Sequence, residues 1–186
     1  GIKFDASTSS TSTSFTHTPV GDPRGIVILA TGPNSGGSLS PVTYGGVSLT
    51  RVRHDQLSSS AQSQSEIWFV GNNIPTGPQT VSLTAGGFTE WTVISFTAVR
   101  DIKVRDSGGG NSASDAGAVS VTLSYANLLS LATVAGAPHN TGSALSGETQ
   151  LASGTHFNGS YWHGYQTNPS QSDFAAGLNV GGSVYA

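Results

Sequence analysis

The chain has 186 residues, enough for one domain with a sizeable core, and only 9% of them are charged. About a quarter of the residues in an ordinary globular protein are charged, so Ser, Thr and Gly replace charged side chains at many polar positions here. The absence of cysteine excludes a disulfide framework and a cysteine metal site, and a net charge of −3 without a concentrated basic surface argues against nucleic-acid binding.

The first candidate strands lie in an N-terminal arm, residues 1–14. Apolar and polar residues alternate over 2–6, which predicts a strand, and the Ser/Thr tract 7–14 then predicts a flexible loop or a polar edge strand. We treat the whole arm as flexible. Residues 15–18 carry one aromatic side chain among polar ones and predict that strand pairing resumes there, and the two prolines that follow end it.

Two later segments have the pattern of central strands. Residues 25–30 form a continuous, mostly β-branched apolar run, which is typical of a strand buried on both sides. Residues 91–99 carry bulky side chains on both faces, which predicts a strand in the middle of a sheet. Residues 66–70 and 79–84 predict further strands, whereas 57–65 are polar and predict a loop.

The clearest local signal is a hairpin at Gly45–Gly46. Val42 and Tyr44 alternate with polar residues before this pair, and Val47 and Leu49 do so after it. Two consecutive glycines between alternating runs predict a tight turn, because glycine adopts positive φ without a Cβ clash. The turn therefore joins two adjacent antiparallel strands.

The second half is predicted to contain short strands separated by loops. The Gly-rich loop 107–117 precedes candidate strands at 119–123, 127–135, 148–152, 174–180 and 183–186. A helix is the alternative for 127–135, but it would be isolated. About a dozen short strands and no amphipathic helix predict one all-β domain over residues 1–186, a two-sheet antiparallel β-sandwich of jelly-roll-like type. An Ig-like sandwich is the alternative, and Trp68, Trp91, Ile28, Val93 and Leu129 are expected to be buried.

The densest aromatic cluster lies at 156–165, where Tyr161, Trp162, His163, Tyr165 and His156 are candidate partner or glycan contacts. Aromatic side chains on a loop can stack on sugars or fill a pocket of a partner. The alternative is that these alternating residues simply pack within a sandwich strand.

Other residue types give weaker signals. The five histidines lack the spacing of zinc ligands, so a surface or core-edge position is expected for each. Asp106, Asn111 and Asp115 do not match a calcium loop, and no Gly-x-Ser-x-Gly nucleophile elbow occurs. We therefore expect no enzyme, no metal and no cofactor.

Several segments together resemble a Ser/Thr/Gly-rich β-sandwich module of phage virion proteins and bacterial surface proteins. The resemblance covers about residues 4–105 and is carried by the following segments: Phe4–Ala6, Phe15–Thr18, Val42–Thr50, Glu66–Phe69 and Val93–Val99. The V-T-Y-G-G-V-x-L-T sequence at 42–50 is its most specific part. The module is mostly structural or adhesive, so the resemblance implies no catalytic residues.

This resemblance leads to an expected function. The first expectation is a virion structural protein, a phage capsid decoration or cement protein or another part of the virion exterior. The alternatives are a carbohydrate-binding or adhesive module of a bacterial surface protein, and a subunit of an extracellular filament. The expected partners are copies of the chain itself as a homo-oligomer, a major capsid or fibre protein, or surface glycans, with no membrane insertion. The chain ends, 1–14 and 174–186, are the expected contacts, and Gly1 fits either loss of an initiator methionine or cleavage of a leader.

Overall fold

The computed structural model describes residues 1–33, 36–57, 63–104, 119–122, 131–136, 143–144, 148–156, 159–167, 173–176 and 178–179. Every regular element within these ranges is a β-strand, and every strand pair is antiparallel. The expected all-β class is thereby confirmed. The described part of the chain contains no helix long and apolar enough to cross a membrane.

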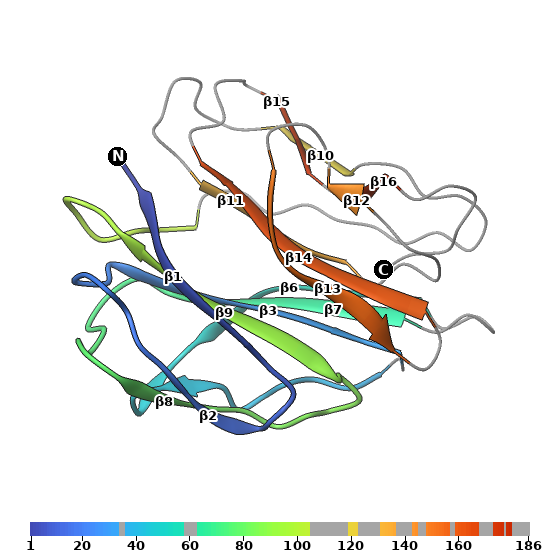
Figure 1. Ribbon diagram of the computed structural model, residues 1–186, viewed down its shortest axis with the longest axis horizontal. Helices are drawn as coiled ribbons and strands as arrows, with labels where there is room; N and C mark the ends of the chain where they lie inside the picture. Colours follow the sequence, from blue (N-terminus) through green and yellow to red (C-terminus); the bar gives the residue numbers. More distant parts are fainter. Residues whose placement is uncertain are drawn as a thin grey trace.

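A five-stranded sheet, here the central sheet, forms the middle of the molecule (Figure 1). In spatial order its strands are β1 (Lys3–Ser10), β9 (Glu90–Thr97), β3 (Gly25–Gly32), β7 (Ser63–Val70) and β6 (Thr50–Leu57). All eight residues of β3 are buried, and β9 lies between β1 and β3. The predicted positions of these two strands are therefore confirmed.

A four-stranded sheet covers one face of the central sheet and completes a sandwich (Figure 1). It is formed by β2 (Ser14–His17), β8 (Gln79–Ser82), β4 (Thr43–Tyr44) and β5 (Val47–Ser48). The core between the two sheets includes Ile28, Trp68, Trp91 and Val93. These four residues were expected to be buried, and each exposes at most 6% of its surface; Leu129 lies outside the described residues.

The hairpin at Gly45–Gly46 has the predicted geometry. Tyr44 pairs with Val47, and Gly45 and Gly46 have φ values of 54° and 82°. Both angles lie in the left-handed region, where a side chain would be strained. The two glycines therefore provide the backbone conformation that reverses the chain.

A smaller three-stranded sheet packs on the other face of the central sheet. It consists of β11 (Leu131–Gly136), β14 (Gly159–Thr167) and β13 (Thr149–His156), and Figure 1 shows β14 and β13 above β3 and β9. Leu151 and Tyr165 pack there against the second apolar cluster, which includes Val27, Leu29, Ile94 and Phe96. Two further pairs complete the described strands: β10 (Val119–Thr122) with β15 (Asp173–Ala176), and β12 (Ser143–Ala144) with β16 (Leu178–Asn179).

Two polar segments form strands. Residues 3–10 form the edge strand β1, which pairs with β9 from Lys3↔Thr97 to Ser10↔Trp91. The strand expected over 2–6 and the edge-strand alternative are confirmed for these residues, and the expectation of a flexible arm is wrong for them; the loop expected over 57–65 is wrong for its last residues. Residues 63–65 of the predicted loop are buried in β7. Both segments are polar, but backbone pairing in a sheet does not require apolar side chains. The Gly-rich loop 107–117 lies outside the described residues.

Candidate functional site

His163 links the three-stranded sheet to the central sheet through a buried set of contacts with Thr31 and Thr92, which we call the clasp. Its ring is fully buried, with Nε2 3.0 Å from the Thr31 hydroxyl on β3 and Nδ1 2.8 Å from the Thr92 hydroxyl on β9. In a neutral imidazole one nitrogen donates a hydrogen bond and the other accepts one. The two hydroxyls can therefore satisfy the neutral ring on both sides.

Burial controls the protonation of this histidine. Removal from water disfavours the charged ring and lowers the pKa of His163 to about 3. His163 is therefore neutral at physiological pH and too weak a base to accept a proton there. Its geometry favours a structural link between sheets over general base catalysis.

The clasp continues into a longer chain of polar side chains. The Thr92 hydroxyl lies 2.9 Å from that of Ser9 on β1, and Glu90 lies opposite Thr31 in the sheet, with its Oε2 buried without a hydrogen-bond partner. Burial raises the pKa of Glu90 above its ordinary value. A carboxyl, an imidazole and hydroxyls thus lie in one region, but His163 is fully buried within it, so a substrate has no access to the ring.

The predicted aromatic contacts are placed mainly in the interior. Trp162 exposes 1% of its surface and its indole N–H donates to Gln150 Oε1 over 2.8 Å. Tyr165 stacks on Phe4 of β1, with ring centroids 4.8 Å apart. Tyr161 is half-buried, and the side chain of His156 lies outside the described residues. The interior positions of Trp162, His163 and Tyr165 agree with the alternative, in which these residues pack a strand.

The histidines differ from their expected surface or core-edge positions in two cases. His17 and His163 are both fully buried, and the His17 Nδ1 lies 2.9 Å from the Thr8 hydroxyl. Burial lowers the pKa of His17. Both ring nitrogens of His163 have a hydroxyl partner, whereas the buried Nε2 of His17 has no hydrogen-bond partner and carries a desolvation cost.

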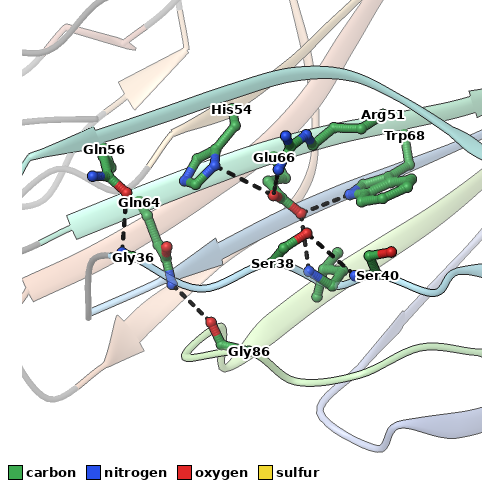
Figure 2. A network of polar contacts seen from close by, with 11 residues as sticks. Gly36, Ser38, Ser40, Arg51, His54, Gln56, Gln64, Glu66, Trp68 and Gly86 are labelled. Carbon is green, nitrogen blue, oxygen red and sulfur yellow. Dashed lines mark hydrogen bonds and ion pairs between the residues drawn. The ribbon is translucent and has the colours of Figure 1, made fainter.

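A second polar cluster surrounds Glu66 inside the sandwich (Figure 2). Its carboxylate is fully buried on β7 and faces the four-stranded sheet, as Trp68 does. Oε2 accepts hydrogen bonds from the indole N–H of Trp68 at 2.7 Å and the backbone N–H of Leu39 at 3.1 Å. Oε1 accepts one from Arg51 at 3.0 Å, and His54 Nδ1 lies 3.5 Å away.

This cluster satisfies a charge that would otherwise be costly to bury. One guanidinium and two N–H donors converge on both oxygens of Glu66, and each charge-assisted hydrogen bond offsets part of the desolvation cost. The cluster joins strands β6 and β7 to the loop that contains Leu39. Within the described ranges, no group of three or more His, Asp or Glu residues could hold a metal ion.

A groove of about 580 Å³ lies at the end of the central sheet where β7 ends and β6 begins. One wall is the start of edge strand β6, Thr50–Val52, and the other is the segment Asp101–Val104. Phe69 and Ile102 contribute apolar surface, whereas Arg51 and Lys103 contribute positive charge. The volume lies within the range of small-ligand sites.

Sequence reasoning did not identify the Glu66 cluster or the groove. The sequence does contain a signal for the Glu66 cluster, because Glu66, Trp68 and Val70 alternate along their strand and share one face of it. A charged residue on an apolar face needs partners, which marks it as a candidate for a buried network. The groove depends on how 101–104 packs beside β7, and no local pattern encodes that contact.

Comparison of this chain with protein-family models, with curated proteins and with solved structures finds no match.

Proposed function

We propose that this chain is a structural protein of a virus exterior, a decoration or cement protein that binds a capsid or fibre protein. The proposal builds on the resemblance of residues 4–105 to the β-sandwich module of phage virion proteins. It also includes self-association, since a surface with few charges offers weak electrostatic protection against assembly. The proposed location is the virion exterior.

The observation that carries the proposal is how the interior polar groups are used. The buried carboxylate of Glu66 and the buried ring of His163 each have hydrogen-bond partners on both of their polar atoms, and these partners include groups from other segments of the chain. Buried polar groups that are satisfied in this way favour a single rigid arrangement of the layers. Rigidity without disulfides is what a repeated exterior part requires.

The same observation supports a non-enzymatic role. A catalytic group needs access to substrate and a pKa near the working pH. His163 has neither property, because its ring is fully buried and its pKa is about 3. We therefore propose a role in binding and assembly.

No observation favours the carbohydrate-binding alternative in the form that the sequence suggested. That form requires the Trp162 ring to stack on a sugar, and the ring is 1% exposed and hydrogen-bonded to Gln150. Of the candidate contacts whose side chains are described, Tyr161 and Tyr165 are only partly buried. A glycan role would need a different surface.

The test is to purify virus particles from the source of the chain and to measure its abundance beside that of the major capsid protein. We expect a fixed molar ratio by quantitative mass spectrometry, and labelling of the particle exterior by an antibody against the chain. Light scattering on the isolated chain measures self-association separately. Absence of the chain from density-purified particles would refute the proposal.

A further inference from the structure

We propose that the end of the central sheet beside the groove is a docking surface for an acidic, extended segment of a partner protein. We call this region the basic end. It consists of the groove between Thr50–Val52 and Asp101–Val104, the exposed residues that directly follow β9 or directly precede β3, and Lys3 at the start of β1. The proposal rests on the proposed function in one respect, that the chain works by binding another protein.

The first observation is where large apolar side chains are exposed. Val20, Val99 and Val104 expose 86%, 89% and 46% of their surfaces, and they are the exposed large hydrophobic residues among those described. All three lie beyond the same end of the central sheet, because β1 begins, β9 ends and β3 begins there. Figure 1 shows the segment after β9, in yellow-green, at the same end as the N-terminus. Val104 lines the groove, and Val20 and Val99 add exposed apolar surface at the same end of the sheet.

The second observation is charge. The basic end exposes five cations against two exposed carboxylates, and it therefore has the opposite sign to the chain, whose net charge is −3. The exposed cations are Lys3, Arg24, Arg51, Arg100 and Lys103, and the carboxylates are Asp22 and Asp101. Asp22 pairs with Arg24 over 2.9 Å, and Arg51 also binds the buried Glu66. The cations of Lys3, Arg100 and Lys103 remain to attract an acidic partner.

The third observation concerns the shape of the partner. β6 is an edge strand of the central sheet, and its first residues form one wall of the groove. An extended peptide can pair with such an edge through main-chain hydrogen bonds. The bulge between Arg51 and Arg53 and the two arginines discourage pairing with a neutral strand. Because Arg51 is paired with Glu66 and Arg53 with Asp55, selection for a strand that carries carboxylates comes from Lys103 on the other side of the groove.

The combination of features favours a protein segment over other anionic partners. Valines and the Phe69 and Ile102 side chains offer apolar contact, which a protein segment with alternating acidic and aliphatic residues can match. A nucleic acid would instead use stacking on exposed aromatic rings and a dense array of cations. The proposed partner segment is therefore an acidic peptide that carries aliphatic side chains between its carboxylates.

The test uses two synthetic eight-residue peptides, one alternating Glu with Val and the other alternating Lys with Val. Each is titrated into the isotopically labelled chain, and amide chemical shifts are followed by NMR. We expect the acidic peptide to bind at least tenfold more tightly, to shift residues 50–52, 71–72 and 101–104, and to weaken as salt is raised.

Variants separate the basic end from the rest of the surface. The double variant Lys103→Glu with Val104→Ser should weaken binding of the acidic peptide at least tenfold. The control, Thr16→Glu with Ser82→Glu, makes the same net charge change on exposed positions of the four-stranded sheet and should leave binding unchanged. Unchanged amide dispersion in both variants shows that each is folded.

Each other outcome counts against the proposal. Equal binding of the two peptides, shifts confined to another surface, or equal effects of the two double variants would overturn it. A single-stranded oligonucleotide or anionic vesicles that shift the same residues more tightly than the acidic peptide would also overturn it, as would sedimentation showing the basic end buried in a dimer of the chain. Failure of the proposed function looks different, since the chain would then bind the peptide and yet be absent from virus particles.

Discussion

Replacement of His163 by glutamine should remove most of the acid sensitivity of this protein. The folded state holds the pKa of His163 at about 3, against an ordinary value of 6.5 in the unfolded chain. Between these two pH values the unfolded chain binds a proton that the folded protein does not. His163 therefore does not reduce the free energy of unfolding above pH 6.5, and it reduces this free energy progressively as the pH is lowered toward 3.

The size of this effect follows from the shift. A proton that only the unfolded chain binds lowers the free energy of unfolding by at most about 1.4 kcal/mol for each pH unit. Over the whole interval between the two pKa values, the loss approaches about 5 kcal/mol. At pH 4 the loss is about 3.4 kcal/mol, which is a large part of the stability of a domain at the lower end of the usual range of roughly 5–15 kcal/mol. The glutamine side chain cannot titrate, but its amide can still donate to one threonine hydroxyl and accept from the other.

The assay is urea unfolding followed by tryptophan fluorescence, at half-unit steps from pH 3.5 to pH 7.5. His17, whose pKa is also lowered, and Glu90, whose pKa is raised, remain in both proteins. The difference in slope between wild type and His163→Gln therefore isolates His163. Equal slopes in the two proteins, or an NMR titration of the ring above pH 5.5, would refute this reasoning.

Three further predictions test other parts of the structure by urea unfolding. Glu66→Ala should lower the free energy of unfolding by about 2–5 kcal/mol, because it leaves buried N–H donors without an acceptor. Asp55→Ala breaks a more exposed ion pair and should lower it by less than about 1 kcal/mol; similar losses in the two variants would contradict the account of the cluster. Gly45→Ala should be more destabilising than Gly46→Ala, because both have positive φ but only the new Cβ at Gly45 meets side chains; the reverse order would argue against this turn geometry. Deletion of residues 1–10 should lower the unfolding midpoint and expose apolar surface to a hydrophobic dye, since it removes β1; a deletion that changes self-association alone would instead support a detached arm.

The parts of the fold that could be predicted are those encoded by local patterns. The run 25–30 is apolar at every position, and a strand buried on both faces requires that pattern. The two glycines at 45–46 identify a turn because of the backbone angles that glycine permits. Each of these signals is contained within a few residues, so it can be read without knowledge of the rest of the chain.

Other features depend on contacts between distant segments. The stretch 7–10 is a strand only because β9 provides its backbone partners, and the polar residues 63–65 are buried because β3 and β6 lie on either side of β7. His163 appeared as a candidate contact because aromatic residues surround it, but its role depends on Thr31 and Thr92. The sequence indicated which residues were unusual, whereas only the tertiary arrangement shows what each one touches.

The bulge at Asp5 has a consequence for how β1 finds its place. The following residues, Ser7–Ser10, are chemically alike, so their composition alone distinguishes poorly between alignments two residues apart, although Thr8 contacts His17 and Ser9 contacts Thr92 in this one. Asp5 removes this ambiguity, because its carboxylate accepts hydrogen bonds from the N–H groups of Val20 and Gly21 and from the Ser95 hydroxyl. These three donors are available together at one alignment of the strand, which coincides with the register shift between Phe4 and Ala6. Asp5 thus acts together with the contacts of Phe4, Thr8 and Ser9 in selecting the alignment of β1.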